Sequence, residues 1–184
     1  MEFITLPPEV TSALIHSGPG PESLIEASNA WQRIGTDLDE TSQSYVTVIS
    51  ELTGGWGGAS EAAMNNAVAP YLSWMRGAAQ QCQQLGNSAL AAAVAFNSTA
   101  SAVVPTVTVA ANRLRLAQLL ATNGFGKNLA AIAETESQYQ QMWINNASAM
   151  YRYEAATAQA TTLSLFSPPP SIVDPSGVAA QAST

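Results

Sequence analysis

Residues 68–103 read VAPYLSWMRGAAQQCQQLGNSALAAAVAFNSTASAV, a run in which apolar or small side chains recur every three or four positions. This spacing places them on one face of an α-helix. The residues that stand seven apart are Val68, Met75, Cys82, Ala89 and Phe96, with Leu72, Ala79, Gly86 and Ala93 between them. The pattern predicts a long helix with a coiled-coil-like seam, whose small residues let a neighbouring helix approach closely.

The sequence on either side predicts further helices, separated by Gly and Pro. Residues 21–53 carry apolar side chains at three- or four-residue steps with acids opposite, and residues 129–165 repeat the seven-residue spacing. Shorter helices are expected over about 8–17 and 109–121. The sequence therefore predicts an all-α fold, an elongated bundle of about five helices over residues 1–165. The Pro/Ser/Ala-rich residues 166–184 cannot cover a core and are expected to be a tail or the start of a C-terminal region.

The charge distribution argues against a nucleic-acid partner. The net charge is −7, and the chain has six Lys and Arg residues, too few for a surface that follows phosphates. Residues 62–133 contain no acid but hold Arg76, Arg113, Arg115 and Lys127. This imbalance indicates either solubility alone or a basic helical tip that meets an acidic partner.

The single cysteine, Cys82, excludes an intramolecular disulfide and is expected to be a small buried side chain. Residues 1–9 lack the basic region and apolar run of a cleavable signal peptide. Residues 77–112 carry no charge, but polar residues and Pro105 interrupt them. Because a spanning helix needs about 20 predominantly apolar residues, we predict no transmembrane span.

Residues suited to catalysis are scarce. His16 is the only histidine, it stands beside a Gly-Pro turn, and its spacing associates it with no Ser, Cys or carboxylate cluster. A catalytic triad or a zinc site is therefore poorly supported. We expect a protein that is not an enzyme, with no cofactor and no metal.

Long helices with seams on more than one side and no thick core leave apolar surface exposed. Another polypeptide is the natural cover for such surface. A homodimer or a self-contained bundle stays open, because periodicity alone does not distinguish these arrangements.

A series of short motifs resembles the N-terminal domain of the PPE proteins of mycobacteria. It covers essentially residues 1–165. The matching residues are Met1-Glu2-Phe3, the Pro-Pro-Glu motif Pro7-Pro8-Glu9 after Leu6, Gly18-Pro19-Gly20, Ala30-Trp31, Leu52-Thr53 with Trp56-Gly57-Gly58, Ala69-Pro70-Tyr71 with Trp74, Ala111-Asn112-Arg113, Ala121-Thr122-Asn123, and Met142-Trp143 with Ala149-Met150-Tyr151.

The resemblance implies a heterodimer with a PE protein, a shorter helical hairpin, in a four-helix-bundle-like module that type VII (ESX) secretion exports. It places the turn Trp56 to Gly58 beside the partner's export signal, Tyr-x-x-x-Asp/Glu, which none of this chain's tyrosines begins. The candidates for the PE interface are Phe3, Leu6, Leu14, Trp31, Ile34, Leu38, Tyr45, Ile49, Leu52, Val68, Leu72 and Met75.

The resemblance also implies that an EspG-type chaperone grips the tip between the fourth and fifth helices in the cytosol. The predicted tip residues are Leu119, Leu120, Asn123, Gly124, Phe125 and Gly126. Gly124 stands where the family has an apolar residue, so Phe125 is expected to carry the apolar contact almost alone. After export we expect a secreted or envelope location, with nutrient or lipid handling or host interaction as the alternative role.

Overall fold

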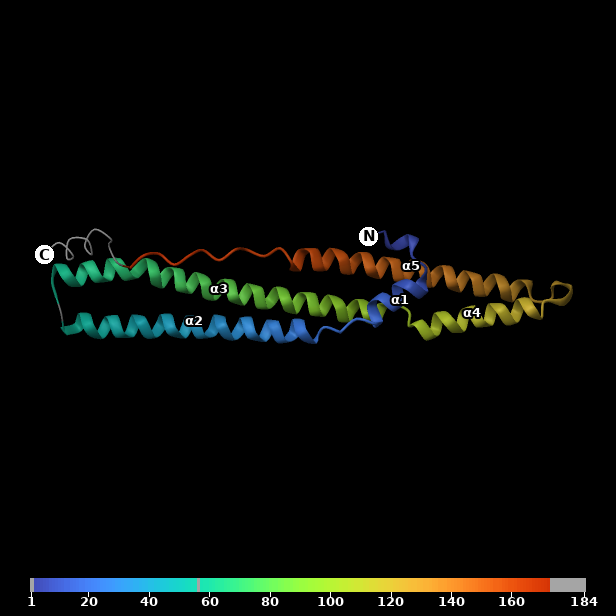
Figure 1. Cartoon of the computed structure of the whole chain (residues 1–184), viewed down its shortest axis with the longest axis horizontal. Helices are drawn as coiled ribbons and strands as arrows, with labels where there is room; N and C mark the ends of the chain where they lie inside the picture. Colours follow the sequence, from blue (N-terminus) through green and yellow to red (C-terminus); the bar gives the residue numbers. More distant parts are fainter. Residues whose placement is uncertain (1, 56, 173–184) are drawn as a thin grey trace. The chain divides into compact units, whose positions relative to one another are not determined.

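The computed structural model describes residues 2–55 and 57–172. Its α-helices are α1 (Pro8–His16), α2 (Glu22–Gly55), α3 (Ala59–Ala102), α4 (Thr106–Ala121) and α5 (Leu129–Ala160) (Figure 1). Two short 3-10 helices, η1 (Phe3–Thr5) and η2 (Gly124–Gly126), complete the elements. No strand occurs in the described ranges, so the prediction of an all-α fold is confirmed.

The chain divides into two compact units. Unit 1 comprises residues 2–25 and 89–162, and unit 2 comprises residues 26–55, 57–88 and 163–172. Helices α2 and α3 each contribute residues to both units. The seam predicted over residues 68–103 therefore contributes residues to two separate cores.

Unit 1 gathers α1, α4, α5 and the second part of α3 around the point where α3 ends. Helix α1 packs against α4 and α5, and η1 packs against α5. The buried core residues are Phe3, Ile15, Val103, Ala147, Ala149 and Met150. Alanines make up two of these six positions, so the helices come close together and the core stays thin.

Two helix boundaries differ from the predicted ones. Helix α4 begins at Thr106 and not near residue 109, because Pro105 is its N-cap and the Pro105 carbonyl oxygen already accepts from the Thr108 and Val109 backbone N–H groups. Helix α5 ends at Ala160 and not near residue 165. There the Thr161 and Thr162 hydroxyls donate to backbone carbonyls of the last turn, which competes with further helical hydrogen bonds.

Unit 2 is a pair of helices, α2 and α3, in close contact along a line of small residues. On α2 the buried positions are Ser28, Gly35 and Ser42, which stand seven apart. A Cβ on Gly35 would lie 3.0 Å from the Ala79 carbonyl oxygen, and one on Gly86 would lie 3.1 Å from the Ser28 carbonyl oxygen. The two backbones therefore nearly touch at both places, as the seam predicts.

Cys82 lies on the same contact line and is 2% exposed, which confirms its predicted burial. Burial raises the pKa of the Cys82 thiol above its ordinary value. The thiol therefore stays protonated and neutral, and it packs as a small apolar side chain.

Residues 163–171 leave α5 as an extended segment and belong to unit 2 (Figure 1). The segment runs alongside the first part of α3, and side chains of α3 hold it at two of its carbonyl groups. This corrects the expectation that residues up to 165 continue the last helix.

The close approach of α2 and α3 predicts that bulk at Gly86 destabilises the chain. We expect Gly86→Val to lower the free energy of unfolding by about 2 kcal/mol more than Gly77→Val does, because a Cβ at Gly77 meets nothing within 4 Å. Both changes place the same residue in the interior of α3, so helix propensity cancels between them. Urea denaturation followed by circular dichroism gives the two values. Equal losses would contradict the close approach.

Candidate functional site

The Pro-Pro-Glu motif begins α1. Pro7 is the N-cap in an extended conformation (φ −64°, ψ 158°), and Pro8 occupies the first helical position, where a missing N–H costs nothing. Pro8 is buried in unit 1, and Glu9 is exposed. The motif thus fixes where α1 starts and presents the Glu9 carboxylate on the outside.

Glu9 is tied to α5 through a tyrosine. The Tyr139 hydroxyl donates to Glu9 Oε2 at 2.9 Å. The Arg113 guanidinium from α4 lies 3.7 Å from the Tyr139 ring centre and forms a 3.3 Å ion pair with Glu136. A cation over an aromatic face is attracted by the negative charge density of the ring. One chain of contacts therefore links α1, α5 and α4.

A buried polar cluster next to the Pro-Pro-Glu motif consists of Thr11, Ser12 and Asn146. Asn146 Oδ1 accepts from the Val104 backbone N–H at 2.9 Å, and its amide nitrogen donates to the Pro8 carbonyl oxygen at 3.3 Å and to Thr11 Oγ1 at 3.2 Å. Ser12 Oγ donates to the Val104 carbonyl oxygen at 2.7 Å. All three side chains are fully buried, so each of these bonds satisfies a group that water cannot reach.

This cluster gives the motif a structural role. It joins the first turn of α1 to α5 and to the non-helical residues between α3 and α4. The seven-residue spacing places Asn146 on a helical seam but does not predict its hydrogen bonds. The signal was present in the sequence, since an asparagine stood at a seam position otherwise held by apolar or aromatic residues.

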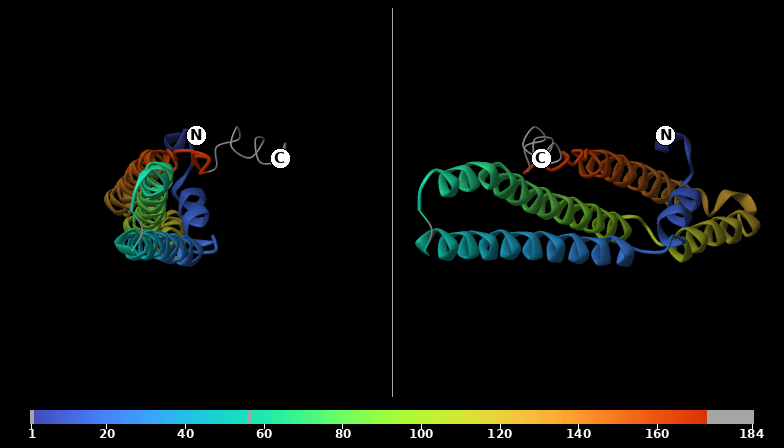
Figure 2. Two further views of the ribbon diagram at one scale, coloured as in Figure 1. Left: turned by 90° about the vertical axis from the view of Figure 1, so that its left-hand side faces the viewer. Right: turned by 60° about the vertical axis from the view of Figure 1, so that its left-hand side comes forward.

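A turn that includes η2 joins α4 to α5 and forms the tip (Figure 2). The aromatic side chain of Phe125 lies on this turn. Phe125 has φ 56° and ψ 23°, a left-handed conformation that side chains other than Gly rarely adopt. Its exposed fraction is 113%, so nothing in the described chain covers the ring. Strained backbone of this kind is concentrated at functional positions.

Two asparagines hold the tip in shape. Asn123 Oδ1 accepts from the Asn128 backbone N–H at 2.8 Å. The Asn128 amide nitrogen donates to the Leu119 carbonyl oxygen at 2.8 Å and to Thr122 Oγ1 at 2.9 Å. The predicted tip residues are thus brought together in a turn, with Leu120 exposed on the last turn of α4 and Leu119 half-buried.

Helix α2 carries exposed apolar side chains along one side of unit 2. Four of them, together with the half-buried Leu38, follow at helical steps of three, four or seven, and we call this set the apolar stripe: Ile34, Leu38, Tyr45, Val48 and Leu52. Val48 and Leu52 are each 52% exposed. Ile49 is the predicted interface residue of this turn, whereas in the structure Ile49 is half-buried and Val48 is exposed.

The other predicted interface residues differ in their solvent exposure. Leu14 is exposed, whereas Phe3 and Met75 are buried by this chain itself. Their part in a partner interface stays a prediction. The half-buried candidates besides Leu38 are Leu6, Trp31, Ile49, Val68 and Leu72.

The predicted secretion-associated turn is described only in part. Trp56 lies outside the described residues. Gly58 has a φ of 111°, which favours glycine, and its carbonyl oxygen accepts from the Ala62 backbone N–H in the first turn of α3. The positive φ at position 58 is therefore the physical reason for a glycine there.

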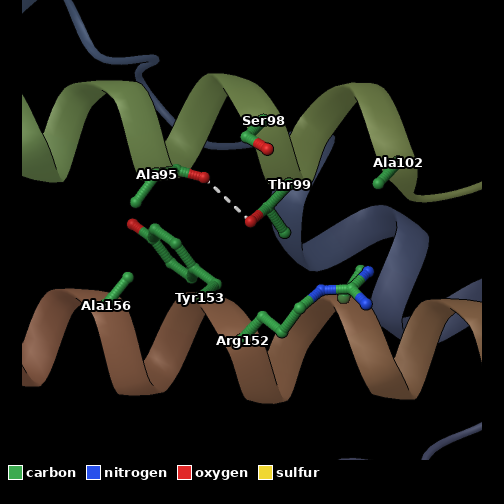
Figure 3. Close-up of a pocket in the computed structure, with 8 residues that line it drawn as sticks. Ala95, Ser98, Thr99, Ala102, Arg152, Tyr153 and Ala156 are labelled. Carbon is green, nitrogen blue, oxygen red and sulfur yellow. Dashed lines mark hydrogen bonds between the residues drawn. The ribbon is translucent and has the colours of Figure 1, made fainter.

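A small pocket lies between α3 and α5 in unit 1 (Figure 3). Its volume is about 150 Å³, below the roughly 300 Å³ at which small-molecule sites usually begin. Arg152 and Tyr153 enter it from α5 opposite Thr99, whose hydroxyl is engaged by the Ala95 carbonyl oxygen at 2.8 Å. No carboxylate, histidine or cysteine lines this pocket, so it offers no nucleophile with a base.

The remaining titratable groups form no recognisable centre in the described ranges. The two ring nitrogens of His16 lie 2.9 Å and 3.2 Å from the carbonyl oxygens of Ser12 and Ala100, and these contacts fix the ring in unit 1. Residues 2–55 and 57–172 contain no group of three His, Cys, Asp or Glu side chains that could hold a metal ion.

One apolar stretch passes a length and composition test for a membrane span. It falls within residues 59–121, where an 18-residue window has a mean hydropathy of 1.5 and 22% of the window is buried. Core helices of soluble proteins pass the same test, so the finding is weak evidence. Val103 to Pro105 interrupt the helix in this range.

Comparison with known proteins decides the family. Residues 2–164 match the PPE family, which includes all of unit 1 and most of unit 2. This chain belongs to the PPE family. The resemblance noted from its short motifs is thereby confirmed, and the polar cluster and the tip described above lie within the matched residues.

Several relatives come from Mycobacterium tuberculosis. The transporter PPE51 is 44% identical over 183 residues, which cover 99% of this chain and 48% of that protein. The PPE family protein PPE26 is 44% identical and is covered to 47% of its length, and PPE29 is 39% identical and covered to 43%. The chain thus spans about half the length of the curated relatives it matches.

The contact between Tyr139 and Glu9 predicts a pH dependence. Burial first, and then the hydrogen bond and charge of Glu9, raise the pKa of Tyr139 above its ordinary value of 10.0. The folded chain therefore holds this proton more tightly than the unfolded chain. The resulting stability is fully present below the unfolded pKa and is lost as the pH rises through the folded pKa.

We expect the free energy of unfolding to fall more steeply above about pH 10 in the wild type than in Tyr139→Phe. Urea denaturation at closely spaced pH values measures both slopes. Glu9→Gln should also flatten the slope, because it removes the neighbouring charge. Parallel slopes in all three proteins would show that the contact is absent in solution.

Proposed function

We propose that this PPE domain is a non-enzymatic pairing module that is exported through a type VII (ESX) system as a heterodimer with a PE protein. An EspG-type chaperone escorts the pair in the cytosol, and the pair ends in the envelope or outside the cell. Membership of the PPE family supports PE pairing in general. The observation that carries the proposal is the apolar stripe of unit 2.

The stripe supports pairing because water solvates it poorly. Burying apolar surface stabilises by about 25 cal/mol per Å², and a contiguous apolar surface marks an interaction site more often than scattered side chains do. The stripe follows α2 for eighteen residues after Ile34, which suits a partner helix that lies lengthwise. Two helices of a PE protein beside α2 and α3 would give a four-helix-bundle-like module.

The tip supports the chaperone part of the proposal. Phe125 is an exposed aromatic side chain on a turn that Asn123 and Asn128 already hold in shape, so binding costs little ordering entropy of the backbone. Lys127 is exposed beside it and suits a rim contact with an acidic chaperone surface. Large exposed aromatics of this kind dominate interface energetics.

The pairing proposal predicts the effect of a charge on the apolar stripe. We expect Val48→Asp to weaken binding of a coexpressed PE protein by about 100-fold, because an unpaired carboxylate would be buried in an apolar interface. Thr47→Asp is the matched control, since it places the same charge one residue away, and Thr47 is exposed outside the stripe.

Copurification and isothermal titration calorimetry measure the pairing. A wild-type chain that is a monodisperse monomer alone and gains nothing from any PE protein would contradict the proposal. Equal effects of the two aspartates would remove the stripe from the interface and leave pairing itself intact.

A second prediction concerns the tip. We expect Phe125→Ala to weaken binding of an EspG-type chaperone by about 30-fold, equivalent to about 2 kcal/mol, without lowering the melting temperature, because the ring touches nothing in the free chain. Leu114→Ala truncates an exposed apolar side chain of α4 away from the tip and should leave affinity unchanged. Surface plasmon resonance provides the affinities, and an unaffected Phe125→Ala would assign the chaperone to another surface.

A second candidate function is envelope association for nutrient or lipid handling after export. The apolar window within residues 59–121 favours it, and the relative PPE51 is named a transporter. Liposome flotation separates the two candidates: movement of the PE-paired protein with the vesicles would favour the second, and retention in the aqueous fraction would discard direct insertion.

A further inference from the structure

The extended residues 163–171, called the strap from here on, are held on unit 2 through their backbone. Gln81 Nε2 donates to the Ser164 carbonyl oxygen at 2.7 Å, and Trp74 Nε1 donates to the Ser167 carbonyl oxygen at 2.8 Å. Between these two bonds, the Phe166 ring stacks on Trp31 of α2, with ring centres 6.1 Å apart and an interplanar angle of 20°. Side chains of both helices thus contact one short segment.

The spacing of the two donors along α3 is close to the spacing of the two carbonyl groups that they bind in the strap. Trp74 and Gln81 stand seven residues apart on one face of α3, a rise of about 10.5 Å. The bonded carbonyls of the strap are three residues apart, and a polyproline II helix turns once in three residues, a rise of about 9.3 Å. The two rises differ by about 1.2 Å, so an extended segment with this repeat suits the spacing of the two donors.

The order of the bonds sets the direction of the strap. The chain advances from Ser164 to Ser167 while its contacts move back from Gln81 to Trp74, so the strap runs antiparallel to α3. Beyond Ser167 it continues towards the start of α3, where the Tyr71 ring stacks on Trp74 at 5.5 Å. An aromatic surface therefore extends past the last hydrogen bond.

The sequence of the strap suits this surface. Pro168, Pro169 and Pro170 fix φ and favour the polyproline II conformation before docking, which lowers the entropy lost on binding. Neighbouring side chains of the strap differ sharply in exposure, 44% for Phe166 and 95% for Leu165. One ring therefore faces Trp31 while the preceding side chain faces solvent.

Indole N–H donors that bind carbonyls of a proline-containing segment, beside stacked aromatic rings, are the means by which proteins recognise polyproline II ligands. We propose that Trp31, Trp74 and Gln81 form a binding site for an extended, proline-containing segment, and that its occupant is the strap of the same chain. The occupied site covers Trp31 from within the chain. The apolar stripe begins after Trp31, at Ile34, so the strap and the stripe use different residues of α2.

The first experiment measures docking of the strap in the full chain by limited chymotryptic cleavage after Phe166. Trp74→Phe keeps the aromatic ring and removes the N–H donor, and Gln81→Leu removes the other donor. We expect each change to speed cleavage about fivefold and the double variant about 30-fold, because cleavage follows the population of the undocked strap.

Gln80→Leu is the matched control: Gln80 is exposed on α3 next to Gln81, and cleavage should match the wild type. Far-UV circular dichroism checks that each variant keeps its helices. Cleavage of the wild type at the rate of the double variant would overturn the proposal.

A second measurement uses variants in the strap itself, which lies outside both helical cores. We expect Phe166→Ala to shift tryptophan emission to longer wavelength as Trp31 becomes hydrated, and we expect no shift for Leu165→Ala, because Leu165 faces solvent. Identical spectra for the two variants would overturn the proposal. Both measurements use the chain without any partner, so their outcome is independent of PE pairing.

Discussion

The close approach of α2 and α3 is the constraint on which unit 2 depends. Ala79 and Ser28 carbonyl oxygens lie where a Cβ on the facing glycine, Gly35 or Gly86, would nearly collide with them. Where the helices meet through glycine, alanine and serine, the backbones lie too close for a large side chain at that point. Bulky apolar residues are therefore displaced to the flanks of the contact line, where the apolar stripe and the aromatic surface under the strap lie.

In unit 1, by contrast, several helices meet where α3 ends and α1 begins. Asn146 satisfies the Val104 N–H and the Pro8 carbonyl together, so backbone groups where α3 ends and α1 begins do not remain unpaired. The Pro-Pro-Glu motif is thus explained by its partners: Pro8 starts the helix, its carbonyl binds Asn146, and Glu9 binds Tyr139. The same unit holds the tip rigid and leaves Phe125 exposed.

In both units the residues that are buried between helices differ in kind from the apolar residues that are exposed. Small residues and a few satisfied polar groups hold the helices together, while many large apolar side chains remain at the surface. A protein that functions alone exposes such side chains mostly singly. Each of the proposed interactions, PE pairing, chaperone binding and strap docking, would bury a different part of this surface. The three parts share no residues.

The sequence by itself determined the helical class, the seam positions Met75, Cys82 and Gly86, and the family, because helical periodicity and short motifs are local properties of the chain. Tertiary structure alone decided that Val48 and not Ile49 faces outward, that Asn146 joins three segments, and that residues 163–171 leave the helical path to lie along α3. These features depend on groups far apart in the sequence, and local propensity carries no information about partners over 80 positions away.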